Sequence, residues 1–345
     1  MNFLIYGSGA IGGYVGGSLA LGGHPVAFVA RPAQADVLNT RGLTLRLNQT
    51  SLVTHSVVAF TSPAEALAHT NPDCIVLALK SFDTPAAIAD LPKGVLLNAP
   101  PILCLQNGVD NEPALAAAFG AERIIAGTVL TAVSAPAVGE VVIEKNRGVG
   151  LFAGHPLSQS VALAFTGAGI LTRLYPNAEA MKWTKLLTNI MANATAAICD
   201  LPTAAVFDHP GLYCVEVGAL REALGVMKAK GLEVVALPRT PTRPLAFALR
   251  YLPPRLYQPI FRRAIAGGRG DKKPSFHSDL SVGKTRTEVG YLNGAVARHA
   301  VALGLPAPIN QRLTEILESI VAGRVPWAEY RGQPGRLIEA VFASP

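Results

Sequence analysis

The chain opens on a short apolar run that leads into a glycine-rich turn, Phe3-Leu4-Ile5-Tyr6-Gly7-Ser8-Gly9-Ala10-Ile11-Gly12. A helical stretch follows to about residue 21, and a second apolar run covers residues 26–30. Strand, glycine turn, helix and strand in this order form the context in which G-x-G-x-x-G predicts a dinucleotide site. Gly7 permits the tight turn, Gly9 admits a pyrophosphate, and Gly12 allows close helix–strand packing. We therefore expect residues Gly7, Ser8, Gly9, Ala10, Ile11 and Gly12 to bind the cofactor.

The end of the second apolar run distinguishes the two nicotinamide cofactors. An acidic residue at this place binds the ribose 2′-hydroxyl, whereas this chain has Ala30-Arg31-Pro32 and no acid before Asp36. An arginine suits a 2′-phosphate. Arg31 therefore favours NADPH over NADH, and the alternative is a surface arginine that caps the sheet.

Further apolar runs alternate with helical stretches and predict a parallel sheet whose ligands lie beyond the carboxyl ends of the strands. The runs are residues 56–60, 74–79, 102–105 and 124–128, and the helical stretches are residues 63–69, 84–91 and 112–119. Two strand ends are polar, because Lys80 follows one and Gln106-Asn107-Gly108 follows another. We expect both ends to face the cofactor.

Residues 141–144 and 149–152 are two short apolar runs on either side of Lys145-Asn146-Arg147-Gly148, and they predict a hairpin that closes this domain. Residues 156–168 and 170–175 predict a further helix and strand. The pattern then becomes helical, over residues 179–197, 211–230, 288–303 and 311–322. The sequence therefore predicts a Rossmann-type α/β domain over residues 1–178 and an all-α domain over residues 179–345, with the substrate between them.

Residues 181–193 predict one mostly apolar helix that carries a polar stripe. Lys185, Asn189 and Asn193 are four residues apart, and each step of four drifts only about 40° around a helix. An ammonium and two carboxamides on one line suit an oxyanion or a carboxylate. The alternative is an ordinary surface helix whose polar side faces water.

Composition sets the broad class. The chain has 345 residues, 50% of them hydrophobic and 15% charged, which is typical of two globular domains. It has no apolar run of about 18 residues and no basic leader, so we expect a cytoplasmic protein without a signal peptide. Four scattered cysteines predict buried, reduced core residues and no metal site.

Positive charge is concentrated in one segment. Residues 236–273 contain nine Lys or Arg and one Asp, a net of +8 against +7 for the whole chain, so the remainder is nearly neutral. A nucleic-acid-binding surface is therefore not expected. The segment also carries Phe247, Tyr251, Tyr257 and Phe261.

Taken together, these residues resemble the ketopantoate reductase family, the 2-dehydropantoate 2-reductases. The resemblance covers most of the chain. It is carried by Gly7-Ser8-Gly9-Ala10-Ile11-Gly12, Arg31, Leu79-Lys80-Ser81, Leu105-Gln106-Asn107-Gly108, Lys185-x-x-x-Asn189-x-x-x-Asn193, Thr287-Glu288-x-x-Tyr291-x-Asn293-Gly294 and Pro308-Ile309-Asn310.

The resemblance implies roles for individual residues. Lys185 would be the catalytic acid, and Glu288 would act with it and bind the substrate hydroxyl. Asn189, Asn193, Ser275 and Asn107 would hold the substrate, and Lys80 and Asn107 would lie near the nicotinamide and bind the cofactor. It also implies a helical domain similar to the C-terminal domain of 6-phosphogluconate dehydrogenase.

The implied activity is the NADPH-dependent reduction of a 2-oxo acid, 2-dehydropantoate or a related one, as in pantothenate biosynthesis. The alternative is a non-catalytic NADP-binding sensor of the same fold, and the retained lysine, asparagines and glutamate argue against it.

Residues 236–273 look like an insertion relative to shorter members of this family. Three interpretations stay open: a lid over the active site, a contact in a homodimer, and a membrane-contacting surface. We expect the segment to border the substrate entrance or pack on a second copy of the chain. We do not expect membrane contact, and its arginines would favour a substrate larger or more acidic than ketopantoate.

Overall fold

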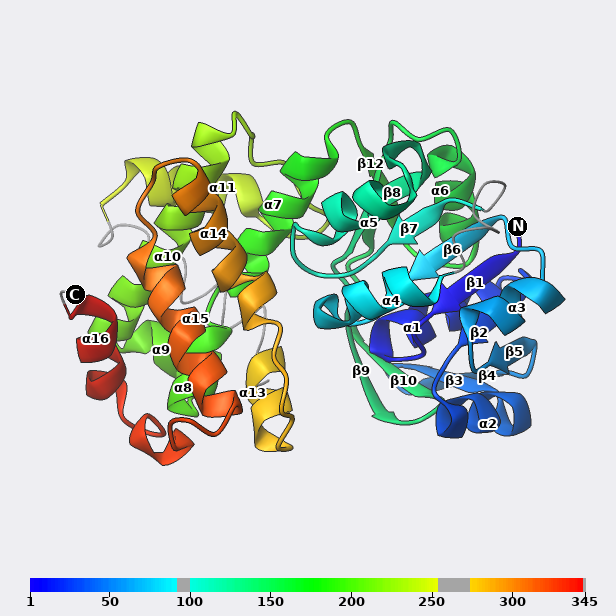
Figure 1. The fold of residues 1–345 in the computed structure, drawn as a ribbon, viewed down its shortest axis with the longest axis horizontal. Coiled ribbons are helices and arrows are strands. Elements are labelled where there is room, and N and C mark those ends of the chain that lie inside the picture. Colours follow the sequence, from blue (N-terminus) through cyan, green and yellow to red (C-terminus); the bar gives the residue numbers. More distant parts are fainter. Residues whose placement is uncertain (92–99, 254–273, 344–345) are drawn as a thin grey trace. The chain divides into compact units, whose positions relative to one another are not determined.

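The computed structural model describes residues 1–91, 100–253 and 274–343, and the chain divides into two units (Figure 1). The first comprises Met1–Lys182 with Leu237–Arg239, and the second Trp183–Ala236 with Thr240–Pro345. More than half of the basic segment predicted at residues 236–273, namely residues 254–273, lies outside the described residues.

An eight-stranded sheet forms the centre of the first unit, in the order β12-β11-β8-β7-β6-β1-β2-β5. Neighbouring strands from β8 to β5 pair in parallel, as the alternation of runs predicts, whereas β11 pairs antiparallel with β8 and parallel with β12. The strands are β1 Phe3–Tyr6, β2 Val26–Val29, β5 Val57–Phe60, β6 Cys74–Leu77, β7 Ile102–Cys104, β8 Ile124–Val129, β11 Val149–Phe152 and β12 Thr172–Tyr175.

Both faces of this sheet are buried, which is why its central strands are apolar at every position. In β1, Phe3 and Ile5 belong to one hydrophobic core, and Leu4 and Tyr6 belong to another. The first core takes in α1 and α6, and the second takes in α3, α4 and α5 (Figure 1). The helices of this unit are α1 Ala10–Leu21, α2 Pro32–Arg41, α3 Pro63–His69, α4 Thr84–Asp90, α5 Asn111–Phe119 and α6 Ser158–Gly167, with the 3-10 turns η1 Ser81–Asp83 and η3 Ala121–Arg123.

A second, four-stranded sheet packs on α1, in the order β4-β3-β10-β9. Its strands are β3 Leu43–Leu47, β4 Thr50–Thr54, β9 Ala132–Ala137 and β10 Glu140–Lys145. The hairpin predicted from residues 141–144 and 149–152 is therefore wrong. β10 pairs with β9 and, in parallel, with the distant β3, whereas β11 joins the large sheet. Glycines of α1 make the close packing possible, since a Cβ at Gly17 would lie 2.1 Å from a methyl of Leu43.

The second unit is helical in its described residues, and the 20-residue α10 is its longest helix. One side of α10 is buried, with Leu212, Leu220 and Met227 fully covered. The helices are α8 Ala194–Cys199, α9 Thr203–Asp208, α10 Pro210–Ala229, α11 Thr242–Tyr251, α13 Ser275–Ser281, α14 Asn293–Ala302, α15 Pro308–Val321 and α16 Pro334–Phe342, with η4 Val289–Tyr291 and η5 Trp327–Glu329.

The helix expected over residues 179–197 is interrupted. α7 spans Ala178–Ile190, and α8 begins at Ala194. Between them Ala192 takes a left-handed conformation, with φ of 49°. A continuous polar stripe from Lys185 to Asn193 therefore does not exist, because Asn193 lies beyond the end of α7.

The four cysteines are not all buried. Cys74, Cys104 and Cys199 are buried as expected, but Cys214 is exposed, which corrects the prediction for that residue.

Among the described residues, no helix is both long enough and apolar enough to cross a membrane.

Candidate functional site

The glycine turn between β1 and α1 has the geometry that its sequence predicts. Gly7 has φ of 112°, which favours glycine, and a Cβ at Gly12 would lie 1.8 Å from the carbonyl oxygen of Gly7. A Cβ at Gly9, in contrast, would meet no other described atom within 4 Å. The backbone at Gly9 is thus open to approach from outside, at the N-terminus of a helix that attracts phosphate charge. These residues fit a dinucleotide.

Arg31 is linked to this turn by Gln34, a residue that the sequence analysis did not single out. Ser8 Oγ donates to Oε1 of Gln34 at 3.1 Å, and Arg31 Nε lies 3.5 Å from the same oxygen. Arg31 is exposed and precedes α2, whose first residue is Pro32. The guanidinium and the glycine turn therefore share one hydrogen-bonded residue, Gln34.

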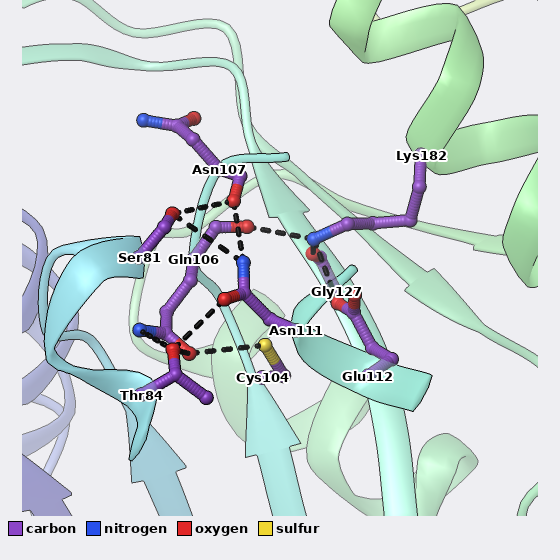
Figure 2. A network of polar contacts seen from close by, with 9 residues as sticks. All are labelled: Ser81, Thr84, Cys104, Gln106, Asn107, Asn111, Glu112, Gly127 and Lys182. Carbon is purple, nitrogen blue, oxygen red and sulfur yellow. Dashed lines mark hydrogen bonds and ion pairs between the residues drawn. The ribbon is translucent and has the colours of Figure 1, made fainter. Parts of the chain in front are cut away.

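The two polar strand ends lie side by side (Figure 2). Ser81 Oγ donates to the backbone oxygen of Asn107 at 2.8 Å, and the Gln106 side-chain amide donates to the backbone oxygen of Lys80 at 3.1 Å. Asn111 Nδ2 adds a second hydrogen bond to the Asn107 oxygen, at 2.6 Å. Side chains thus hold the backbone next to Lys80 and Asn107.

Gln106 is 3% exposed and lies at the centre of this network. Its Nε2 donates to Thr84 Oγ1 at 3.0 Å, and Thr84 Oγ1 in turn donates to Asn111 Oδ1 at 2.8 Å. Burial raises the pKa of the Cys104 thiol well above its usual range, and the nearby Glu112 carboxylate adds to the shift. The protonated thiol can therefore donate to Gln106 Oε1, 3.6 Å away.

A buried lysine outside the predicted site completes the network. Lys182, at 5% exposure, places Nζ 2.6 Å from the Gln106 carbonyl oxygen, 3.2 Å from that of Gly127 and 2.7 Å from Glu112 Oε1. The polar run from Gln106 to Glu112 could have drawn attention to this region, but nothing in the sequence links it to a residue 70 positions later.

In the second unit, Lys185 and Asn189 share one side of α7, four residues apart. Both are half-buried, whereas Leu186, Leu187 and Ile190 around them are at most 2% exposed. The helix thus presents two polar side chains from an apolar surrounding, as the sequence predicts for this part of the stripe.

Asn193 is placed by the start of another helix. Its Nδ2 donates to Ser275 Oγ at 3.2 Å, and its Oδ1 accepts from the backbone N–H of Phe276 at 3.1 Å. The structure therefore brings together Asn193 and Ser275, two of the residues that the family resemblance assigned to the substrate.

The break between α7 and α8 has a partner that sequence reasoning missed. The backbone N–H of Ala192 donates to Glu216 Oε2 at 2.6 Å, and Glu216 on α10 is 1% exposed. A buried carboxylate from α10 therefore holds the chain where α7 ends.

Glu288 is 3% exposed and precedes η4, since α14 begins only at Asn293 and not at residue 288 as predicted. Asn293 Nδ2 donates to Oδ1 of Asn310 at 2.9 Å, so two stretches that carry the family resemblance touch. Asn310 Nδ2 donates to Glu222 Oε2 at 2.7 Å, and burial raises the pKa of Glu222. This buried network fixes the chain that follows Glu288.

A Rossmann-type sheet with an open glycine turn, joined to a helical unit that carries a lysine–asparagine face, defines a two-domain dinucleotide-binding oxidoreductase. The family model described as "Ketopantoate reductase PanE/ApbA" matches residues 3–151, and its C-terminal model matches residues 177–321. The chain belongs to the ketopantoate reductase family, whose members act on a CH–OH group.

Relatives of known name agree with this assignment. The chain is 27% identical to 2-dehydropantoate 2-reductase of Pyrococcus horikoshii over 324 residues, which cover 92% of this chain and 97% of the relative. The corresponding protein of Halobacterium salinarum is 28% identical over 330 residues, which cover 92% and 98%.

Solved structures share the fold. A ketopantoate reductase from Ralstonia eutropha has a TM-score of 0.78 at 26% identity, covering 94% of this chain and 99% of that one. D-mandelate dehydrogenase with NADH and anilino(oxo)acetate has a TM-score of 0.76, with the same coverage. At 19% identity the latter shows the fold alone.

Proposed function

We propose that this protein reduces 2-dehydropantoate to pantoate with NADPH. The observation that carries the proposal is the pair Lys185 and Asn189 on an otherwise buried helix, in a chain whose two units both match the family. The relatives named above as 2-dehydropantoate 2-reductases support the substrate, and the open glycine turn with Arg31 supports the cofactor.

Lys185 is the proposed proton donor. When NADPH is bound, it supplies the hydride that converts the ketone into an alkoxide. An alkoxide needs a cation or a proton donor within hydrogen-bond reach, and an ammonium held on a rigid helix meets both needs. Lys185 Nζ would therefore stabilise the developing charge and pass its proton to the substrate oxygen.

The neutral polar groups bind without competing for that proton. Asn189 and Asn193 are carboxamides, which can donate to a carboxylate without taking up a proton at neutral pH. The Asn193–Ser275 hydrogen bond fixes the Asn193 amide, so that little side-chain entropy is lost on binding. Glu288, which can accept a hydrogen bond, is proposed to bind the substrate hydroxyl and act with Lys185.

The cofactor would bind along residues Gly7 to Gly12. Its 2′-phosphate would meet Arg31, which Gln34 holds beside Ser8, and its nicotinamide would lie near Lys80 and Asn107. One charge-assisted phosphate contact is the difference from NADH, and such a contact is stronger than a neutral one.

The test is a panel of 2-oxo acids assayed with NADPH and with NADH, together with chiral analysis of the product. The panel includes 2-dehydropantoate, shorter aliphatic 2-oxo acids, a dicarboxylic 2-oxo acid and an aryl 2-oxo acid. We expect the highest kcat/KM with 2-dehydropantoate and NADPH. A higher kcat/KM for another member would replace the proposed substrate, and no turnover at all, despite NADPH binding, would favour a cofactor-binding sensor.

A matched control distinguishes an effect on NADPH binding from an effect on turnover. Lys185→Met retains most of the side-chain length and removes the charge, so it should bind NADPH like the parent and lose turnover. Unchanged turnover in Lys185→Met would remove Lys185 from the mechanism.

A further inference from the structure

We propose that Lys182 and Glu112 are positioning residues that hold the Gln106–Asn107 turn in the shape required for hydride transfer. Neither residue belongs to the proposed substrate or cofactor contacts. The inference rests on the proposed function, because it assigns Asn107 to the nicotinamide side of the site.

The first step concerns the three groups around Lys182 Nζ. An ammonium has three N–H bonds, and Nζ faces the carbonyl oxygens of Gln106 and Gly127 and the carboxylate of Glu112 (Figure 2). The pairing of β7 with β8 ends at Cys104 and Ala126. Lys182 therefore bridges β7 and β8 just beyond the point where the hydrogen bonds between these two strands stop.

The second step concerns the peptide groups on either side of Asn107. The Gln106 carbonyl belongs to the peptide before Asn107, and Lys182 holds it at 2.6 Å. The Asn107 carbonyl belongs to the peptide after it, and Ser81 and Asn111 hold that oxygen at 2.8 and 2.6 Å. Two fixed peptide planes determine φ and ψ of Asn107 and so the direction of its side chain, which Figure 2 shows pointing away from the network.

The third step concerns the part played by Glu112. Both of its carboxylate oxygens are buried, and its Oε1 lies 2.7 Å from Lys182 Nζ, the charged group that it faces. Its contribution is therefore to neutralise the buried ammonium. Replacing a buried ion pair by an apolar pair of similar volume is often neutral or stabilising, so the pairing of the two charges is not by itself a reason of stability. What the apolar pair could not replace is the donor to the two carbonyl oxygens.

The experiment uses the full chain and three variants, Lys182→Met, Glu112→Leu and the double variant Lys182→Met with Glu112→Leu. Each single variant leaves one buried charge uncompensated and should lower Tm. The double variant removes both charges but also the donor to the Gln106 and Gly127 carbonyl oxygens, so we expect its Tm to lie above that of either single variant and at or below that of the parent. Its kcat should nevertheless fall at least about ten-fold, because the turn loses the donor that aligns it and small misplacements are costly in catalysis.

Two further readouts separate positioning from a general structural role. Hydrogen exchange of the cofactor-free protein should become faster in peptides that contain residues 105–109 and stay unchanged in α10. The Kd for NADPH should rise less than three-fold, while the isotope effect with NADPH deuterated at the transferred hydrogen should increase. The control is Arg46→Met with Glu140→Leu, which removes a half-exposed ion pair, 3.2 Å long, from the other sheet of the same unit. We expect no change in kcat for this control.

Parental kcat and parental hydrogen exchange in a stable double variant would overturn the proposal, as would a kcat loss equal to that of the control. A parent protein inactive on every 2-oxo acid would refute the proposed function alone. In that case hydrogen exchange would still decide whether Lys182 and Glu112 hold the turn. Faster exchange of residues 105–109 in the double variant would support that role, and unchanged or slower exchange would overturn it.

Discussion

The Gln106–Asn107 turn and the α7–α8 break each place a proposed active-site asparagine just past the end of a regular element. In the turn, side-chain donors from Lys182, Ser81 and Asn111 hold backbone carbonyls. In the break, a side-chain acceptor, Glu216, holds the backbone N–H of Ala192. In each place a buried side chain supplies the partner that the local backbone lacks, since buried backbone polar groups must be paired. The strand end is thus held by buried donors, and the helix break is held by a buried acceptor.

The largest expected effect separates proton donation by Lys185, on the helix that leads into the break, from cofactor binding. Lys185→Ala should lower kcat by about 10²–10⁴, the usual range for a general acid, because the alkoxide loses its proton donor. The Kd for NADPH should stay within about two-fold of the parent, since the cofactor is proposed to bind at the glycine turn. Rapid-mixing kinetics and fluorescence titration check both numbers. A large loss of NADPH affinity would show that Lys185 also contributes to cofactor binding.

The next effect tests the acceptor at the helix break. Glu216→Leu leaves the buried N–H of Ala192 without its carboxylate partner, and we expect a loss of about 3 kcal/mol in the free energy of unfolding. Urea denaturation measures it. Glu216→Gln, which keeps an oxygen acceptor, should recover more than half of the loss. If both variants are as stable as the parent, the carboxylate is not what holds the break.

A smaller effect belongs to the cofactor side alone. Arg31→Ala should reduce the preference for NADPH over NADH by about ten-fold, or 1.4 kcal/mol, through loss of one charge-assisted contact. The KM for the 2-oxo acid should not change. Titration of both cofactors into the parent and the variant gives the ratio, and equal parental affinities for NADPH and NADH would contradict the role of Arg31.

The smallest expected effect is an increase in the free energy of unfolding. Ala192 has φ of 49°, a conformation that costs an alanine roughly 1–2 kcal/mol and costs glycine little. Part of that gain is offset because glycine has more freedom in the unfolded chain. Ala192→Gly should therefore stabilise the protein by about 0.5 kcal/mol in urea denaturation. A destabilised variant would show that the alanine methyl contributes packing that outweighs the strain.

These two regions also differ in how well the sequence predicts them. Lys80 and Asn107 could be predicted as neighbours, because parallel strands end at one edge of a sheet and both residues directly follow such strands. The break could not, because Met191 and Ala192 are good helix formers and carry no signal for a helix end. A carboxylate from the distant α10 holds the chain at this point, and tertiary contacts of this kind override local propensity.

The same limit explains the other errors. The alternation in residues 140–145 is enough to predict a strand, but its neighbour β3 lies almost a hundred residues earlier, so a local hairpin was the wrong partner. Lys182 resembles any surface lysine in the sequence, since burial of a charge depends on Glu112 and on two strand ends. The glycines at positions 7 and 12 were predictable because their reason is local, one a positive φ and the other a 1.8 Å approach to the backbone.

The three residues Leu237–Arg239 have a consequence for how the protein is made. They belong to the first unit, where Arg239 Nη1 donates to the Asn146 carbonyl oxygen at 2.7 Å, although 54 residues of the second unit precede them in the chain. A ribosome delivers the chain from its N-terminus, and domains tend to fold as they emerge. The nucleotide-binding unit can therefore assemble its sheets early in translation, but its last contact waits until α10 has been synthesised.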